Sequence, residues 1–133
     1  MHAFGGPTHM IFNKNISALA KVNSFFRQAI ITGSHMQVVV MSLSPGEDAG
    51  ESVHATDQIV VVVEGEGYAT VSGERESITA EHLVFIPAGA VHNFGNTGKT
   101  DLKLYVVYAP PHHKPGTIHA NKTEAEAAQS LAI

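Results

Sequence analysis

Two histidines and a glutamine have the types and spacing from which a metal site could be built. His54 and Gln58 stand in the stretch HATDQ, and His92 follows the distant turn PAGAV. Imidazole nitrogens and amide oxygens bind divalent transition metals, and the chain contains no cysteine that would supply a thiolate. These three side chains could therefore hold Mn, Fe, Ni, Zn or Co if the fold brings them together.

The residues before Gln58 follow a two-residue alternation. Strand side chains point to opposite faces in turn, so in an extended segment Ser52 and His54 share one face with Gln58, whereas Glu51 faces the other way. We expect Ser52 to bind water or support the ligands rather than bind a metal itself. Glu51 would take part only if a bulge at Gly50 shifted the register.

A structural explanation of the same residues stays open at this point. His54 and His92 would then be buried histidines satisfied by hydrogen bonds, and Gln58 would be an amide in the wall of the core. A further group, His112, His113 and His119, lies in a segment rich in proline and glycine. These three are expected to be surface or interface groups, unless that segment folds over a barrel mouth.

Short apolar runs must position these residues. The runs contain many β-branched residues and end at Gly, Pro, Asn or Ser, which is typical of strands joined by turns. They occupy residues 25–31, 36–43, 59–63, 68–71, 83–86 and 102–108. This spacing predicts an all-β sandwich or barrel. A short helical turn is expected over residues 15–21, and Thr123 with Glu126 forms a predicted capping box that starts a C-terminal helix reaching Ile133.

Composition limits the class of protein. The 133 residues fit one domain, with a barrel core at about 25–110, an N-terminal arm at 1–24 and a C-terminal tail at 111–133. The net charge is −4 and the basic residues are scattered, which argues against nucleic-acid binding. The apolar run at 59–63 is far too short to span a membrane, and no signal peptide is recognisable. We expect a cytoplasmic protein.

The spacing of these residues resembles the two motifs of the cupins. The first motif, a glycine, two histidines, a glutamate and a closing glycine, falls on Gly46, Ser52, His54, Gln58 and Gly65. The second motif, which runs from glycine through proline, glycine and histidine to asparagine, falls on Glu81, Pro87, Gly89, His92 and Asn96. The resemblance covers residues 46–96 and implies a jelly-roll β-barrel with a central metal, here followed by a short C-terminal helix.

The resemblance also implies roles for individual residues. Cupins ligate metal through both histidines and the glutamate of the first motif and the histidine of the second, so His54, Gln58 and His92 are the ligands implied here. Ser52 replaces the first histidine and Gln58 replaces the glutamate. The Pro87–Gly89 turn would aim the His92 ring inward. Asn96 is expected to close the strand as a turn residue that tolerates unusual dihedral angles.

A divalent metal bound by these ligands is expected to keep its full positive charge. Neutral imidazoles and a neutral amide leave a divalent ion its full charge of about +2, which favours anion binding and Lewis-acid chemistry. We expect a metal-dependent enzyme acting on a small oxygenated or carboxylated metabolite, of isomerase, lyase or dioxygenase type. The alternatives are a barrel that binds a metal or small ligand without chemistry, and a metal-free structural barrel. A homodimer is expected, because the run at 59–63 suits a strand covered on both faces.

Overall fold

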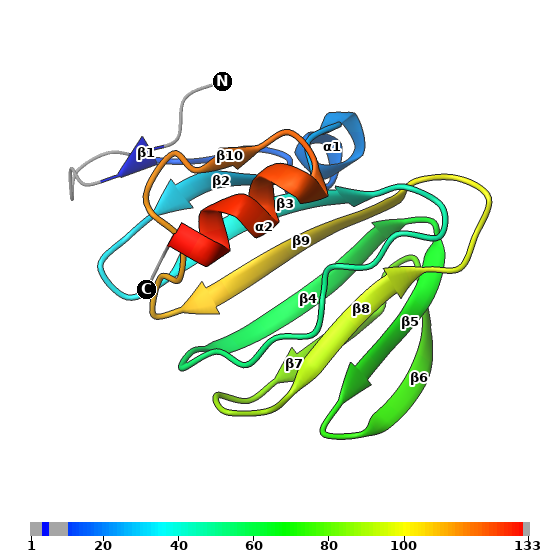
Figure 1. The fold of residues 1–133 in the computed structure, drawn as a ribbon. Helices are drawn as coiled ribbons and strands as arrows, with labels where there is room; N and C mark the ends of the chain where they lie inside the picture. Colours follow the sequence, from blue (N-terminus) through cyan, green and yellow to red (C-terminus); the bar gives the residue numbers. More distant parts are fainter. Residues whose placement is uncertain (1–3, 6–10, 132–133) are drawn as a thin grey trace.

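Two sheets, antiparallel except where β1 pairs with β2, pack face to face to form a flattened barrel (Figure 1). The computed structural model describes residues 4–5 and 11–131. The large sheet consists of β1 (Phe4–Gly5), β2 (Arg27–Thr32), β3 (Gln37–Leu43), β9 (Leu102–Ala109), β4 (Asp57–Glu64) and β7 (Leu83–Ile86), with β10 (Ile118–His119) paired to β2. The small sheet has β5 (Glu66–Val71) between β6 (Glu74–Thr79) and β8 (His92–Asn96).

Side-chain alternation separates the inner and outer faces of the large sheet. Along β4, Val60 and Val62 are buried between the sheets, while Ile59 and Val61 are half-buried on the outer face. The register of β9 places Val106 beside Val60 on the inner face. Burying a valine of this kind stabilises a fold by roughly 1.5–3 kcal/mol. The inner residues of both sheets form one core, to which β5, β6 and β8 contribute Ala69, Ile78 and Phe94.

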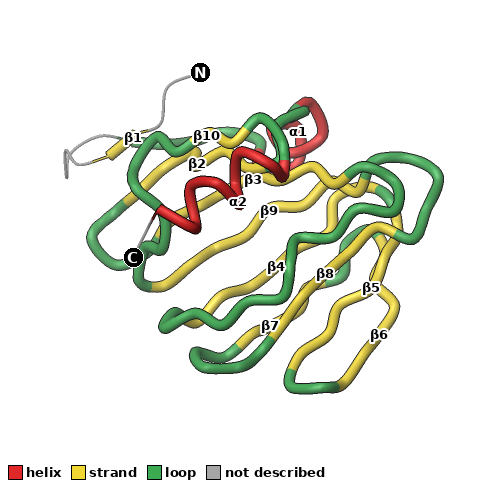
Figure 2. Tube along the Cα trace, viewed as in Figure 1, coloured by secondary structure: helices red, strands yellow, loops and turns green. Residues whose placement is uncertain are grey.

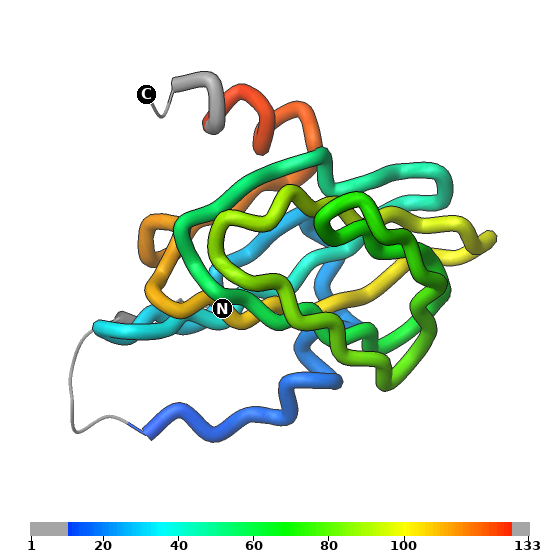
Figure 3. The backbone as a smooth tube through the Cα atoms, turned by 90° about the horizontal axis from the view of Figure 1, so that it is seen from below, coloured from blue at the N-terminus to red at the C-terminus, as the bar shows by residue number. Residues whose placement is uncertain are grey.

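Two short helices lie on opposite sides of the large sheet (Figure 3). Helix α1 (Ile16–Val22) begins after Asn15, whose side-chain oxygen accepts a hydrogen bond from Ala18 N at 3.0 Å. Its residue Ala20 is fully buried and belongs to a small apolar cluster with Ile30 and Val40 of the outer face. No helix of the described residues is long and apolar enough to cross a membrane.

Helix α2 (Lys122–Leu131) corrects the predicted capping box. Asn121, not Thr123, caps the helix, because its side-chain oxygen accepts a hydrogen bond from Glu124 N at 2.9 Å. Glu124 reaches back to Ala120 N at 3.1 Å, so the predicted pairing of Thr123 with Glu126 is wrong by two residues. The expected end of the helix at Ile133 lies outside the described residues. So do residues 1–3 and 6–10 of the expected N-terminal arm.

The predicted all-β jelly-roll fold with a C-terminal helix is confirmed (Figure 2). All six expected strands are present, with ends shifted by two residues at most. The apolar pattern failed to predict β6, because five of its six residues are exposed and only Ile78 is buried. The strand exists because it pairs along its whole length with β5.

Candidate metal centre

Gln58 occupies one end of the barrel interior. On the inner face of the large sheet, it lies between Tyr108 of β9 and Ile86 of β7, and Tyr108 in turn pairs with Gln37 of β3. All four side chains are buried. This row of glutamine, tyrosine and glutamine marks the point where the apolar core gives way to polar groups.

His54 and His92 reach this end of the barrel from two adjacent segments. The chain between β3 and β4 runs along the free edge of β8, where Ser52 and His92 exchange two backbone hydrogen bonds of 2.9 Å. His92 is only 3% exposed. His54, two residues beyond Ser52, has the same inward parity and is half-buried. Backbone pairing therefore places the two rings side by side, with centroids 5.0 Å apart.

The turn before His92 is bonded to the segment that carries His54. Gly89 N donates to His54 O at 2.9 Å, and Ala88 N donates to the carboxylate of Asp57 at 2.9 Å. Gly89 has a φ of 85°, in the left-handed region that favours glycine. The PAGAV turn thus orients His92 relative to His54 through backbone contacts, and Asp57 is a structural residue that supports the turn.

The ring nitrogens of both histidines converge on the Gln58 amide. Gln58 Nε2 lies 2.9 Å from His92 Nε2 and 3.3 Å from His54 Nδ1. His92 Nδ1 donates to the carbonyl oxygen of Ala90 at 3.0 Å, so its Nε2 carries the lone pair. The amide nitrogen donates to both rings, and two imidazole lone pairs therefore point at one position.

These donors fit a divalent metal. Rotating the Gln58 amide by half a turn would place its oxygen where its nitrogen now lies. These two orientations of the amide are distinguished by their hydrogen bonds alone. The carbonyl oxygen of Ala90 accepts from His92 Nδ1 and so leaves His92 Nε2 unprotonated, which is the tautomer that can bind a metal through Nε2. Among the described residues no group of three His, Asp or Glu is arranged to hold a metal ion, so the third ligand would have to be Gln58.

Ser52 contacts the cluster through its backbone pairing with His92, not through its side chain. The Ser52 hydroxyl donates to Gly50 O at 3.3 Å, within its own loop. Glu51 is exposed and has the outward parity, because exposed and less exposed residues alternate from Glu51 to Gln58.

Asn96 ends β8 as expected, and its side-chain oxygen accepts from Gly98 N at 2.8 Å in the turn that follows, but the expected unusual dihedral angles are not found in its φ. It is buried, and its side chain also bonds Leu43 O and Thr100 O at 2.9 and 2.8 Å.

The tail segment after β9 lies against the cluster, as in the alternative in which it folds over the barrel mouth, and sequence reasoning missed only the stacking of His112 on His54. The His112 ring stacks on His54 with centroids 3.9 Å apart, and its outer side is exposed to solvent. Gln37 holds this segment, since its side-chain oxygen accepts from the backbone N of His112 and His113 at 3.2 and 2.9 Å. The available signal was the antiparallel register of β9 and β4, which places residues following Tyr108 next to residues preceding Gln58.

Burial shifts the pKa values of several groups in and around this cluster. Burial, with the nearby positive charges, lowers the pKa of His54 to about 4 and that of His113 to about 2. Partial burial also lowers the pKa of His112, and full burial raises the pKa of Tyr108. The one strong cation acting on these groups is Arg27 of β2. The electrostatic environment therefore favours an anion.

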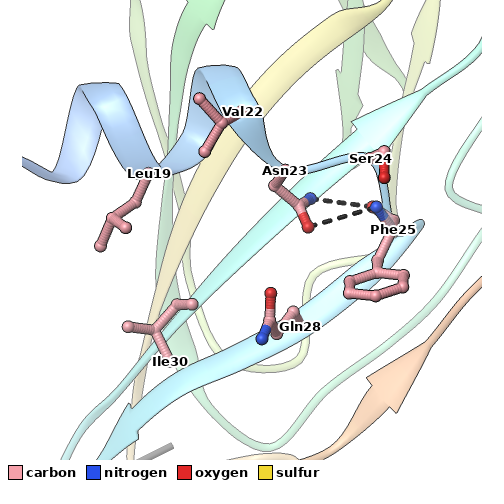
Figure 4. Close-up of a pocket in the computed structure, with 7 residues that line it drawn as sticks. All are labelled: Leu19, Val22, Asn23, Ser24, Phe25, Gln28 and Ile30. Atoms are coloured by element: carbon pink, nitrogen blue, oxygen red, sulfur yellow. Dashed lines mark hydrogen bonds between the residues drawn. The ribbon is translucent and has the colours of Figure 1, made fainter. Parts of the chain in front are cut away.

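A separate pocket of about 200 Å³ lies between α1 and β2 (Figure 4). Asn23 spans its rim and exchanges two hydrogen bonds with the backbone of Phe25, at 2.9 and 3.2 Å. The remaining lining residues are Leu19, Val22, Ser24, Gln28 and Ile30. None of these residues titrates, and Ile30 belongs to the outer cluster, so this pocket is not part of the histidine site.

Three comparisons with known proteins bear on this geometry. A family model described as a cupin domain matches residues 39–108. The uncharacterized protein YrkC of Bacillus subtilis (strain 168) is 41% identical over 125 residues, which cover 89% of this chain and 67% of that protein. The crystal structure of BH2720 from Bacillus halodurans has a TM-score of 0.88 at 40% identity, covering 90% of this chain and 96% of the other.

A second similar structure carries a functional description of its own. It is a predicted oxalate decarboxylase from Thermotoga maritima, with a TM-score of 0.56 at 29% identity. The match covers 59% of this chain and 69% of that one. These similarities, together with the two sheets and the converging histidines, place the chain in a family of known architecture.

Proposed function

This chain belongs to the cupin family, and from that premise we propose that it is a small metal-binding cupin that acts as an enzyme on a small oxygenated or carboxylated metabolite. The observation that carries the proposal is the convergence of His54 Nδ1 and His92 Nε2 on the Gln58 amide. Two lone pairs aimed at one position, with an amide that can present oxygen there, form the core of a divalent metal site.

Each residue of the proposed centre has a distinct role. His54 and His92 supply nitrogen ligands, Gln58 supplies its amide oxygen, and the Ala90 carbonyl holds the His92 tautomer. When bound, a metal would supply Lewis-acid polarisation of a ligand oxygen. The ligands are all neutral, so the charge of the ion is not reduced and a carboxylate or enolate is the favoured class of ligand. His112 offers a basic nitrogen on the solvent side of His54.

The comparison with a relative supports a carboxylated ligand. The similar Thermotoga maritima protein is described as a predicted oxalate decarboxylase, a name that implies a small dicarboxylate. The positive charge of Arg27, which contributes to the lowered pKa of His54, agrees with such a ligand. Isomerase, lyase and dioxygenase reactions all remain within this proposal.

A non-catalytic binding barrel is the second candidate. The observation that favours it is that Gln58 already satisfies both histidine nitrogens by donating its amide protons. A glutamate at this position would repel the lone pairs and require a cation, whereas the glutamine satisfies both histidine nitrogens without a bound ion. Such a barrel would bind a small anion or a weakly held metal and release it unchanged.

Metal analysis of protein purified without chelators or nickel resin tests the proposal. We expect a divalent metal at sub- to near-stoichiometric content, lost in His54→Ala and in His92→Ala. His35→Ala serves as the control, because His35 is an exposed histidine outside the centre. Full metal content in both site variants would overturn the proposed site. Turnover in a panel of small oxygenated acids would then separate the enzyme from the binding barrel.

We also propose a cytoplasmic homodimer. The outer face of β4 and β7 supports the dimer, since Leu83 and Phe85 are 56% and 55% exposed and lie beside the half-buried Val61 and Ile59. A contiguous apolar sheet face of this kind is suited to cover by a second copy of the chain. Sedimentation at micromolar concentration should give the mass of a dimer, and a Phe85→Lys variant should shift it to that of a monomer.

A further inference from the structure

Arg27 directs its side chain toward the barrel interior. It pairs with Met41 of β3, and directly opposed residues of antiparallel strands share a face. Met41 is fully buried in the main core, so Arg27 lies on that same inner face. The guanidinium carbon is 5.2 Å from the centroid of the Phe26 ring, and one terminal nitrogen donates to His119 Nδ1 at 3.1 Å.

The guanidinium of Arg27 has unused hydrogen-bonding capacity. Its Nε is buried and has no hydrogen-bond partner among the described residues. A second buried nitrogen in the same region, His113 Nε2, also has none. Both residues lie beside His119, which bonds Arg27 and whose ring centroid is 6.4 Å from that of His113. Buried polar groups of folded proteins are nearly always hydrogen-bonded, so the two atoms indicate the place of a missing partner.

The charge of Arg27 is also uncompensated. The ion pairs of the described residues join Lys103 to Asp101 and Lys122 to Asp48, and none involves Arg27. Burial lowers its pKa, and the one group that opposes this effect is the phenol of Tyr108, which is itself buried. A buried cation without a counter-ion is costly, whereas a cation that pairs with an incoming anion is a recognition group.

Arg27 lies on the inner face of the large sheet, but not in the row of Gln58, Tyr108 and Gln37, which ends on Thr32 of β2. β2 carries Arg27 and β4 carries Gln58, with β3 and β9 between them and Tyr108 on β9.

The tail segment connects Arg27 to the cluster. Arg27 bonds His119, whose ring centroid lies 6.4 Å from that of His113. The His113 ring lies 4.6 Å from that of His112, which stacks on His54 at 3.9 Å. A ligand that reached from Arg27 to the proposed metal ligands would need two separated polar groups.

We propose that Arg27 and His113 bind a carboxylate of the ligand, while a second oxygen-bearing group of that ligand lies toward His54, Gln58 and His92. The site is thereby assigned to small dicarboxylates and to hydroxy or keto acids. The inference deepens the proposed function, since it names the group that selects the ligand, but it does not depend on a metal. Arginine is suited to this role because its planar fork matches a carboxylate.

Malonate binding to chelator-treated protein tests the inference. We expect malonate to raise the melting temperature of the wild type and to bind measurably in calorimetric titration, whereas the uncharged analogue malonamide does neither. Arg27→Met should weaken malonate binding at least tenfold, about 1.4 kcal/mol. His113→Phe, which removes Nε2 and keeps a ring, should weaken it severalfold. Arg75→Met is the matched control, because Arg75 stacks on Tyr68 of the small sheet at 3.7 Å.

The outcomes distinguish this inference from the proposed function. Equal malonate binding by the wild type and Arg27→Met, or no binding by metal-free wild type, would overturn the role of Arg27 even if metal analysis is positive. Arginine-dependent malonate binding by a protein that never takes up metal would support the inference and overturn the metal site. Should Arg27→Met fail to fold, Arg27→Lys keeps the charge but lacks the fork, and unchanged malonate affinity in that variant would contradict the inference.

Discussion

The amide nitrogen of Gly89 donates a hydrogen bond of 2.9 Å to the carbonyl oxygen of His54. Through this bond the turn that precedes His92 is attached to the backbone of the other proposed nitrogen ligand. The two histidines are far apart in sequence, yet their relative position is set by this contact and by the backbone pairing of Ser52 with His92. The geometry of the centre therefore depends on the turn as much as on its own side chains.

Replacing Gly89 by alanine tests this dependence. The φ of 85° costs a non-glycine residue about 1–2 kcal/mol, and an added Cβ would meet no atom within 4 Å, so backbone strain is the whole expected effect. Denaturant unfolding should show a loss of that size, and metal affinity should fall with it. The control is Gly33→Ala, whose added Cβ would lie an ordinary 3.5 Å from Met36 O. Equal losses in both variants would contradict the prediction.

Gln58→Glu distinguishes a metal ligand from a wall residue. If the amide oxygen binds the ion, the added charge should raise metal affinity at least tenfold and should weaken malonate binding. Without metal, the carboxylate would face two imidazole lone pairs and lose both hydrogen bonds, so the apoprotein should melt at a lower temperature. Titration of metal and of malonate, with thermal melts, measures all three effects.

Gln28→Glu provides the comparison for that experiment, since Gln28 lines the separate pocket near α1. Its metal affinity should equal that of the wild type. A lowered melting temperature for Gln58→Glu with unchanged metal affinity would show that Gln58 is not a ligand.

Glu81→Gly should stabilise the protein. Glu81 has a φ of 75°, and this is the position where the second cupin motif has its leading glycine. Its backbone is held by a 2.8 Å hydrogen bond from Glu81 N to Val62 O, which glycine would keep. Removing the strain should raise the free energy of unfolding by about 1 kcal/mol. Glu76→Gly, within the regular strand β6, should instead lower it, and stabilisation of both variants alike would contradict the explanation.

Acid should destabilise the fold partly through His113. Its pKa is lowered by burial from 6.5 to about 2, so between these values the unfolded chain binds a proton that the folded chain does not. Above pH 6.5 His113 is neutral in both states and does not reduce the free energy of unfolding. As the pH falls below 6.5, protonation of the unfolded chain lowers the free energy of unfolding progressively. His113→Phe should flatten this dependence in chelator-treated protein. If the free energy of unfolding varied with pH in the same way for the wild type and the variant, His113 would not contribute to the acid sensitivity.

Local patterns in the sequence were sufficient for much of the fold. Strands with apolar inner faces and clear turn residues were predictable, because period-two alternation and Gly or Pro punctuation act over a few residues. The common inward parity of Ser52, His54 and Gln58 was predictable for the same reason, and so was the importance of the turn before His92. The strand β6 was not, since its exposed residues carry no alternation and its existence depends on pairing with β5.

Long-range register determined the remaining features of the site. The Gln58 amide donates to two rings only because β8 and β4 meet at one end of the barrel, and His112 covers His54 because β9 runs antiparallel to β4. Arg27 enters the same region from β2, far away in sequence. Apart from the contact of Gln58 with His54, which are four residues apart, these contacts join residues whose separation along the chain carries no periodic signal. The packing of the two sheets, rather than the local conformational preference of any segment, therefore decides which polar groups lie together at this end of the barrel.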